Sequence, residues 1–221
     1  MSYKLLDLFS GPGGAAFGYH KAGFEDITGV DNEQMKQYPF KHIYKDVFKL
    51  DINFIKEFDF IHASPPCQAY SIGSESARQK GKVYPDLVEA TRQLLIDSGK
   101  PYIIENVPNA PLINPIILCG TQFNLKVFRH RLFETNIKSL RGKVNKCNHT
   151  GLKVKYTMYG EGNMFGVAGK QYGNKDQWNE AMGGELDFVP SKRLMAQVIP
   201  PAYTEFLGKQ VIKYLDSNLK R

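Results

Sequence analysis

The sequence predicts an α/β fold, with a mostly parallel sheet and helices on both of its faces. Short apolar runs at residues 4–9, 27–30, 58–63 and 102–104 have the length and composition of buried strands. Segments with helical spacing lie between them, one after the glycine-rich turn at 11–14 and another at 86–97. Strands that alternate with helices favour a parallel sheet over a sandwich or a bundle.

Length and composition predict one compact domain with a small appendage. The chain has 221 residues, of which 42% are hydrophobic and 23% are charged, enough to bury a sizeable core. No apolar run reaches the roughly 18 residues of a membrane span. The N-terminal stretch turns polar and glycine-rich too early for a signal peptide. We therefore expect an intracellular protein without a membrane partner.

The charge balance favours a polyanionic partner. The formal net charge is +7, and neutralised phosphates release counterions. A merely basic soluble protein would have the same total, so the distribution is more informative. One stretch contains six basic residues and no acidic one, namely Lys138, Arg141, Lys143, Lys146, Lys153 and Lys155.

The cysteines indicate a reducing compartment and no metal. Three cysteines, at 67, 119 and 147, form too sparse and odd a set for a disulfide framework. Cys147 is close to His149 in sequence, but no second ligand pair accompanies them. The sequence therefore predicts an unpaired loop cysteine rather than a zinc ligand.

The C-terminal part divides into two segments. Residues 139–190 are rich in Gly, Lys, Asn and Tyr, with little periodicity, which predicts a small irregular insertion. A proline pair then precedes an amphipathic helix whose core-facing residues are Tyr203, Phe206, Leu207, Val211 and either Tyr214 or Leu215. We expect a core at 1–138, a small region at 139–190, and a segment at 191–221 that returns to the core.

A glycine turn predicts a nucleoside-type ligand at the carboxyl ends of the strands. Gly11 and Gly13 lie between a strand and a helix, and Asp31 follows Gly11 by 20 residues, at the end of the next strand. Glycines let the backbone approach a ligand, and the acid can accept hydrogen bonds from ribose hydroxyls. NAD, FAD and S-adenosylmethionine all fit this pattern, as does a plain glycine turn. Asp46, after a third strand segment, could reach an adenine amino group.

Three further segments have residue types suited to covalent and acid–base chemistry. The prolines around Cys67 would hold its sulfur at a strand end, where a positive setting would favour a nucleophilic thiolate. Glu105 ends another strand, and burial would raise the pKa of its carboxyl. Arg129 and Arg131 occupy alternate positions of a strand-like run at 127–133 and would share one face. Considered separately, these could be a buried cysteine, a strand-end acid and an exposed basic strand.

Together, in this order, the segments resemble the DNA cytosine-5 methyltransferase family. The phrases that support the resemblance are DLFSGPGG at 7–14, SPPCQ at 64–68, ENV at 105–107, RHR at 129–131 and AQVIPP at 196–201. The short form is similar to phage- or prophage-type members. Val127 stands where the family has a glutamine, and Gln197 where it has an asparagine.

The resemblance implies a Rossmann-like methyltransferase fold and a role for each site residue. S-adenosylmethionine would be the cofactor and S-adenosylhomocysteine the product. Double-stranded DNA would be the partner, residues 139–190 the target-recognition region, and the bacterial or phage-infected cytoplasm the location. The implied catalytic residues are Cys67, Glu105, Arg129 and Arg131. The implied cofactor-binding residues are Phe9, Ser10, Gly11, Gly13, Gly14, Asp31, Asn32, Asp46, Val47, Pro66 and Gln197. The implied substrate-binding residues are Gln68, Ser71, Asn106, Lys143, Lys153 and Lys155.

The resemblance also implies a mechanism. The Cys67 thiolate would add to carbon 6 of a flipped cytosine while Glu105 hydrogen-bonds or protonates N3 and Arg131, with Arg129, holds the base oxygen. Carbon 5 would then accept the methyl group. Three alternatives stay open: an RNA cytosine-5 methyltransferase acting on tRNA, a non-catalytic DNA-binding homologue, and a dinucleotide oxidoreductase based on the glycine turn alone.

Overall fold

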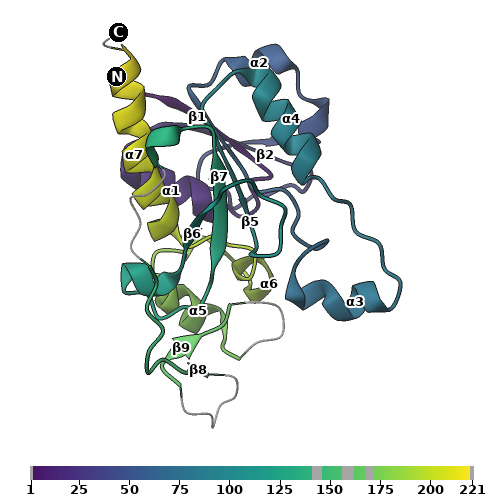
Figure 1. The fold of residues 1–221 in the computed structure, drawn as a ribbon, viewed down its shortest axis with the longest axis vertical. Coiled ribbons are helices and arrows are strands. Elements are labelled where there is room, and N and C mark those ends of the chain that lie inside the picture. The colour runs from purple at the N-terminus through teal and green to yellow at the C-terminus, as the bar shows by residue number, and fades with distance from the viewer. Residues whose placement is uncertain (1, 141–145, 156–161, 168–171, 220–221) are drawn as a thin grey trace.

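The computed structural model describes residues 2–140, 146–155, 162–167 and 172–219, and its centre is a seven-stranded sheet (Figure 1). The strand order is β3-β2-β1-β4-β5-β7-β6. The first five strands in this order run parallel, and β7 is antiparallel to both β5 and β6. The bounds are β1 Lys4–Leu8, β2 Asp26–Asp31, β3 Lys41–Tyr44, β4 Phe60–Ala63, β5 Tyr102–Asn106, β6 Ile116–Leu118 and β7 Arg131–Thr135. The predicted mostly parallel sheet is confirmed.

Helices cover both faces of the sheet, as the alternating pattern predicted (Figure 1). On one face, α1 (Gly14–Ala22) and α7 (Pro201–Leu219) bury one apolar cluster; on the other, α2 (Ile52–Lys56) and α4 (Val88–Ser98) bury a second. Neighbouring strand residues alternate between them, since Leu5 belongs to the first cluster and Leu6 to the second. Among the described helices, none has both the length and the apolar character of a membrane span.

Close contact between α1 and α7 depends on a glycine. A Cβ on Gly18 would lie 2.1 Å from both the Pro201 carbonyl oxygen and Thr204 Oγ1. Thr204 Oγ1 also donates to the Ala15 carbonyl at 2.9 Å. The predicted face of α7 is confirmed, because Tyr203, Leu207, Val211 and Leu215 are buried, with Phe206 and Tyr214 partly buried against the same cluster.

The described part of residues 139–190 is more regular than the sequence predicted. It contains the short parallel pair β8 (Val154–Lys155) and β9 (Met164–Phe165), and the helix α5 (Lys175–Ala181). Asn174 caps α5: its side chain accepts from the backbone N–H of Gln177, and the Gln177 side chain accepts from the backbone N–H of Asn174. Trp178 is fully buried in the apolar cluster under α1 and α7. This region therefore shares its core with the sheet.

The segment at 127–133 is a strand only in its second half. β7 begins at Arg131, so the expectation of a strand from 127 is wrong. Before it, the backbone pairs with β9 instead: Phe128 N donates to the Phe165 carbonyl and Phe165 N to the Lys126 carbonyl, both at 2.8 Å. Arg129 consequently lies outside the strand, and the alternate-position argument does not apply to it.

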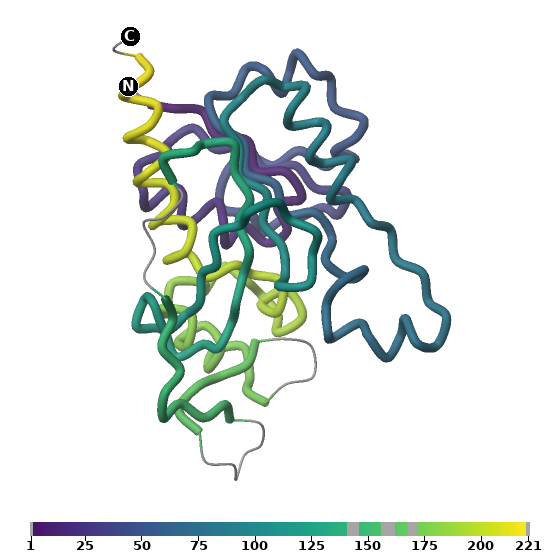
Figure 2. The backbone as a smooth tube through the Cα atoms, in the orientation of Figure 1, coloured from purple at the N-terminus to yellow at the C-terminus, as the bar shows by residue number. Residues whose placement is uncertain are grey.

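The remaining short elements connect the strands and the long helices. They are η1 Val47–Lys49, η2 Ile72–Ser74, α3 Glu75–Gln79, η3 Gly120–Phe123, η4 Lys138–Leu140 and α6 Lys192–Met195. The segment between β4 and α4, which contains η2 and α3, projects from the body of the molecule (Figure 2).

Candidate active site

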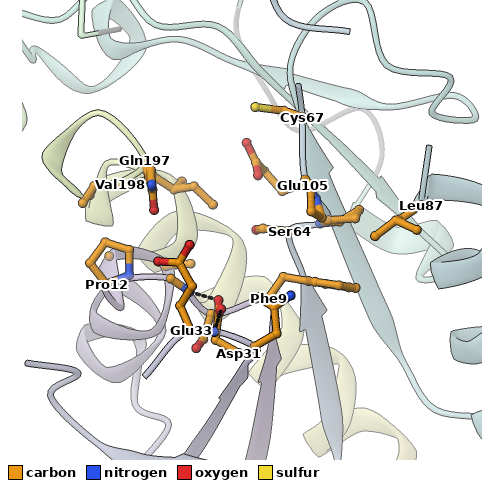
Figure 3. A pocket seen from close by; sticks show the side chains of 18 of the residues that line it. Phe9, Pro12, Asp31, Glu33, Ser64, Cys67, Leu87, Glu105, Gln197 and Val198 are labelled. Atoms are coloured by element: carbon orange, nitrogen blue, oxygen red, sulfur yellow. Dashed lines mark hydrogen bonds between the residues drawn. The ribbon is translucent and has the colours of Figure 1, made fainter. Parts of the chain in front are cut away.

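A cavity of about 510 Å³ opens where β1 and β4 end. The chain leaves β1 toward β2 and β3 on one side, and the later strands β4 and β5 lie on the other. This is the switch point at which open α/β sheets bind ligands. Residues from the β1–α1 turn, the loop after β4, β5, β7 and the segment before α7 line the cavity (Figure 3).

The glycine turn forms one end of the cavity. Gly11 has φ +49° and donates its backbone N–H to Asp31 Oδ2 at 2.9 Å, and Asp31 Oδ1 accepts from Glu33 N at 2.8 Å. Gly13 has φ +95°, and a Cβ there would meet Pro39 at 2.7 Å. Gly13 is therefore needed for the turn and its packing, and it does not line the cavity.

Apart from Gly13, all the residues predicted to hold a cofactor line the cavity. They are Phe9, Ser10, Gly11, Gly14, Asp31, Asn32, Asp46, Val47, Pro66 and Gln197. Asp46 also caps η1 by accepting from Phe48 N at 3.0 Å. The rings of Phe9 and Phe48 lie edge to face with centroids 6.0 Å apart, so they give this end an apolar wall.

The lining residues that sequence reasoning missed include Glu33, Phe48 and Leu87. The only signal for Glu33 was an acid two residues beyond Asp31. Phe48 comes shortly after a strand, and Leu87 comes at the end of a loop. An isolated apolar residue in such a place has no spacing that would mark it as part of a site.

Cys67 lies at the opposite end, close to Glu105 (Figure 3). It is half-buried in the loop after β4, and its carbonyl accepts from the backbone N–H groups of Tyr70 and Ser71 at 3.0 and 2.9 Å. Asn106 Nδ2 donates to the Pro65 carbonyl at 2.9 Å. Asn106 is buried behind the loop and does not line the cavity, so it fixes the loop in place instead of facing a substrate.

Glu105 forms a buried ion pair with Arg131. Arg131 Nε lies 2.9 Å from Glu105 Oε1, with the two side chains 14% and 7% exposed. Burial raises the pKa of the Glu105 carboxyl, and the two arginines and a hydrogen bond from Ser64 only partly oppose this. A carboxyl with a raised pKa is suited to share a proton with a ring nitrogen.

Arg129 is held more firmly than the sequence predicted. Its guanidinium donates to the carbonyls of Val167 and Ala196, the latter at 2.8 Å. Its own carbonyl accepts from Tyr203 Oη at 2.6 Å. Burial and the neighbouring Arg131 lower its pKa to about 9. Arg129 lines the cavity, and its bonds also tie the segment around Val167 and the segment before α7 to the site.

Ser64 belongs to a buried polar chain behind Glu105. Tyr19 Oη lies 3.0 Å from His62 Nδ1, and His62 Nε2 lies 2.9 Å from Ser64 Oγ. Burial lowers the pKa of His62 to about 3, so the imidazole is neutral. With Tyr19 donating to Nδ1, the Nε2–H group donates to Ser64. The Ser64 hydroxyl can then donate to Glu105.

The charges around the Cys67 thiol are mixed, with one carboxylate and two arginines nearby. Burial and the Glu105 carboxylate raise its pKa, while Arg131 and Arg129 lower it by less. These surroundings therefore favour the thiol over the thiolate in the protein alone. The thiol must lose its proton in the course of a reaction.

Three of the other residues predicted to bind the substrate lie away from the cavity. Gln68 lines it, but Ser71, Lys153 and Lys155 do not. Lys155 Nζ lies 5.3 Å from the centre of the Tyr172 ring. Lys143, with Arg141, lies outside the described residues. Val127 is fully buried, and a Cβ on Gly120 would meet its carbonyl oxygen at 2.1 Å, so it is a core residue.

The fold is that of a methyltransferase. The structure matches that of the Dnmt2 methyltransferase of S. pombe with a TM-score of 0.65 and 13% identity, covering 97% of this chain and 99% of that one.

Sequence comparison then identifies the family. The model of the C-5 cytosine-specific DNA methylase family matches residues 3–112. The type II methyltransferase M.HgiGI of Herpetosiphon aurantiacus is 32% identical over 122 residues, which cover 49% of this chain and 94% of that protein. M.FnuDI of Fusobacterium nucleatum is 31% identical over 113 residues, 47% of this chain and 32% of that protein. The chain belongs to the C-5 cytosine-specific DNA methylase family. It spans about a third of the length of most curated relatives that it matches.

Proposed function

We propose that this protein transfers a methyl group from S-adenosylmethionine to carbon 5 of a flipped cytosine in double-stranded DNA. The observation that supports this most directly is the convergence of Cys67, Glu105 and Arg131 in one cavity with the glycine turn. A nucleophile, an acid and a cation meet within reach of one small ring, next to a nucleoside-type pocket.

The glycine end of the cavity fits S-adenosylmethionine. Ser10 Oγ is buried and has no hydrogen-bond partner among the described residues, so it can bond a ligand's polar group. At Gly11 the nearest atom to an added Cβ would be Gln197 Oε1 at 4.0 Å, which leaves the backbone open to a ligand. The Glu33 carboxylate could accept from ribose hydroxyls, and the Phe9 and Phe48 rings could pack against adenine. The bound cofactor would supply an electrophilic methyl group.

At the other end, this chain's side chains would activate the base. Cys67 loses its proton and its sulfur forms a bond to carbon 6, which pushes electrons toward carbon 5. Glu105 holds or protonates N3, and Arg131 stabilises the negative charge that develops on the base. After carbon 5 has gained the methyl group it loses its proton, the sulfur–carbon bond breaks, and Cys67 departs. The covalent bond between Cys67 and the base is therefore broken again by the end of the reaction.

The cavity is sized for one extruded nucleoside next to a cofactor, and a duplex would have to present its cytosine by base flipping. Lys153 and Lys155 of the proposed recognition region would contact phosphates. The projecting segment between β4 and α4, which follows Cys67 in the chain, has Ile72 and Val83 exposed. Phosphate contacts would position the duplex, while base contacts would specify the site.

Replacing Cys67 tests the proposal. Cys67→Ala should abolish transfer of labelled methyl from S-adenosylmethionine into duplex DNA, and also the covalent adduct with DNA that contains 5-fluorocytosine. This base traps the adduct, because carbon 5 has no proton to release after methylation. Isothermal titration should show S-adenosylmethionine binding close to wild type.

Assays with two different substrates distinguish the alternative functions. Parallel assays with duplex DNA and tRNA should give transfer into DNA; transfer confined to tRNA would reassign the substrate. Full transfer by Cys67→Ala would remove the cysteine from the mechanism. A wild-type protein that binds DNA but transfers nothing to either polymer would favour a non-catalytic homologue.

A further inference from the structure

Four metal-ligating side chains meet outside the cavity. The ligand atoms of Cys119, His130, Cys147 and His149 all lie within 4.8 Å of one another. Cys119 Sγ is 3.5 Å from His149 Nε2, and Cys147 Sγ is 3.5 Å from His130 Nε2. Cys119 is buried and the other three are half-buried.

The sequence gave no second ligand pair for Cys147 and His149, but the fold supplies one. Cys119 directly follows β6, and His130 directly precedes β7. These antiparallel neighbours bring the two residues together although eleven positions separate them. Cys147 therefore lies beside three other possible metal ligands, two of which the sequence did not point to.

The two sulfur–nitrogen contacts have the length expected in a tetrahedral zinc site. With Zn–S bonds of about 2.3 Å and Zn–N bonds of about 2.0–2.1 Å, a tetrahedron has S···N edges of roughly 3.5 Å. Both reported S···N distances have this value. Two thiolates also neutralise the charge of one Zn²⁺ ion, which favours binding in a half-buried site.

The arrangement argues against an iron–sulfur cluster. A two-iron cluster with two cysteines and two histidines places the cysteines on one iron and the histidines on the other. Here each cysteine sulfur instead contacts a histidine nitrogen, and all four ligand atoms lie within 4.8 Å of one another, close enough to share one ion. One ion with sulfur and nitrogen ligands is the pattern typical of zinc.

The surroundings support a metal-binding role. The Phe128 ring packs on both imidazoles, with centroids 4.3 Å from His149 and 5.3 Å from His130. Thr121 Oγ1 donates to Cys119 Sγ at 3.6 Å, as an outer residue that orients a ligand would.

We propose that Cys119, His130, Cys147 and His149 bind one structural Zn²⁺ ion. Four protein ligands leave no open position, so the ion serves structure rather than chemistry. It would join the end of β6, the start of β7 and the segment at 147–149, fastening the recognition region to the sheet. This proposal replaces the sequence-based expectation of a protein without a metal.

The ion would also fix the catalytic end of the cavity. His130 lies between Arg129 and Arg131, both of which line the cavity. A metal bond to the His130 imidazole would hold the backbone at this point, and with it the direction of the two guanidinium groups. The proposal does not depend on the reaction, because its tests measure metal and thiols.

Metal analysis of the full chain tests the proposal. The protein is purified under reducing conditions with any histidine tag removed, and its metals are measured by mass spectrometry. We expect one zinc ion per chain, and tetrahedral visible absorption after exchange with Co²⁺. Cys147→Ser and His149→Gln should lose the zinc. Cys67→Ser, a matched cysteine replacement outside the cluster, should keep it.

A second measurement needs no variant and decides the question if the variants do not fold. Alkylation of Cys147 in the folded wild-type protein should be slow, and a zinc chelator should accelerate it and lower Tm by several degrees. Three results would overturn the proposal: absence of bound metal, equal Cys147 labelling with and without chelator, or an intact mass that shows a Cys119–Cys147 disulfide in place of metal.

Discussion

Glu105 owes its place in the cavity to two neighbouring side chains. Its carboxyl is held from one side by Arg131 and from the other by Ser64. Ser64 is in turn oriented by the neutral imidazole of His62. Because a hydroxyl has one proton, accepting from His62 leaves that proton free to point at Glu105. Ser64 is therefore a positioning residue for the acid.

Ser64→Ala should make the Glu105 carboxyl easier to protonate. The Ser64 hydrogen bond lowers the pKa of Glu105, so its loss should raise that pKa further. We expect the limb of the activity–pH profile that reports Glu105 to move to higher pH. The value of kcat/KM should fall roughly 10-fold, since a hydrogen bond to a charged group contributes about 1.5 kcal/mol. Methyl-transfer rates across the pH range would measure both effects.

A general loss of stability would lower the rate without moving the limb. Ser217→Ala, which removes an exposed hydroxyl bonded to the Tyr214 carbonyl on α7, controls for such an effect and should leave the profile unchanged. An unshifted limb in Ser64→Ala would show that Ser64 does not act on Glu105.

At the scale of elements, a buried ion pair joins α4 to the antiparallel strand β7. Arg92 Nε and Nη2 donate to Glu134 Oε1 and Oε2 at 2.7 and 2.9 Å, and both side chains are less than a tenth exposed. Glu134 also accepts from Ile113 N at 2.7 Å. Arg92 further donates to the Pro111 carbonyl at 2.8 Å. The pair therefore fixes a helix, a strand and the loop between β5 and β6.

Removing one partner of this pair should be costly. Arg92→Met leaves a buried carboxylate unpaired, for which we expect a loss of about 3–5 kcal/mol in the free energy of unfolding. The double variant Arg92→Met/Glu134→Gln should lose less than the sum of its single variants, because the amide oxygen can still accept from Ile113 without a charge. Denaturant unfolding of the three variants gives the coupling.

The exposed pair of Lys126 and Glu180, 3.5 Å apart, provides the matched control. Lys126→Met should change the free energy of unfolding by less than about 1 kcal/mol. Strict additivity in the Arg92–Glu134 cycle would mean that the buried pair contributes no coupling energy.

For the whole molecule, the sequence predicted what depends on local order along the chain. The parallel strands place Gly11, Cys67 and Glu105 at one edge because each follows or ends a strand, and strand ends can be recognised locally. Contacts across the fold could not be predicted this way. Arg129 bonds two carbonyls from distant segments, and Asn106 bonds Pro65 across neighbouring strands.

The proposed zinc ligands could not be predicted from local order in the sequence either. No short motif joins Cys119, His130 and the pair at 147–149, since the antiparallel turn between β6 and β7 is what assembles them. The sequence also predicted too long a strand at 127–133. The pairing of the backbone at 126–128 with β9, more than thirty residues further along the chain, has no local signal.

The buried polar chain makes the stability of the whole protein sensitive to acid. His62 is fully buried with a pKa of about 3, whereas an unfolded histidine has a pKa of about 6.5. Below that value the unfolded chain binds a proton that the folded chain refuses, so stability falls with falling pH. Between pH 8 and pH 5 this one group should cost about 2 kcal/mol. Asp7 and Glu105, whose pKa values are raised by burial, act in the opposite direction.

Comparison with His62→Gln isolates the histidine from those carboxyls. Because both proteins contain Asp7 and Glu105, the difference between their free energies of unfolding should change by about 2 kcal/mol from pH 8 to pH 5, with the wild type losing more. Nitrogen NMR of the wild-type imidazole gives the direct measurement and should report the neutral ring at pH 5. A protonated ring at that pH, or a parallel pH dependence of the two proteins, would mean that burial does not hold His62 neutral, and the orientation of Ser64 toward Glu105 would lose its cause.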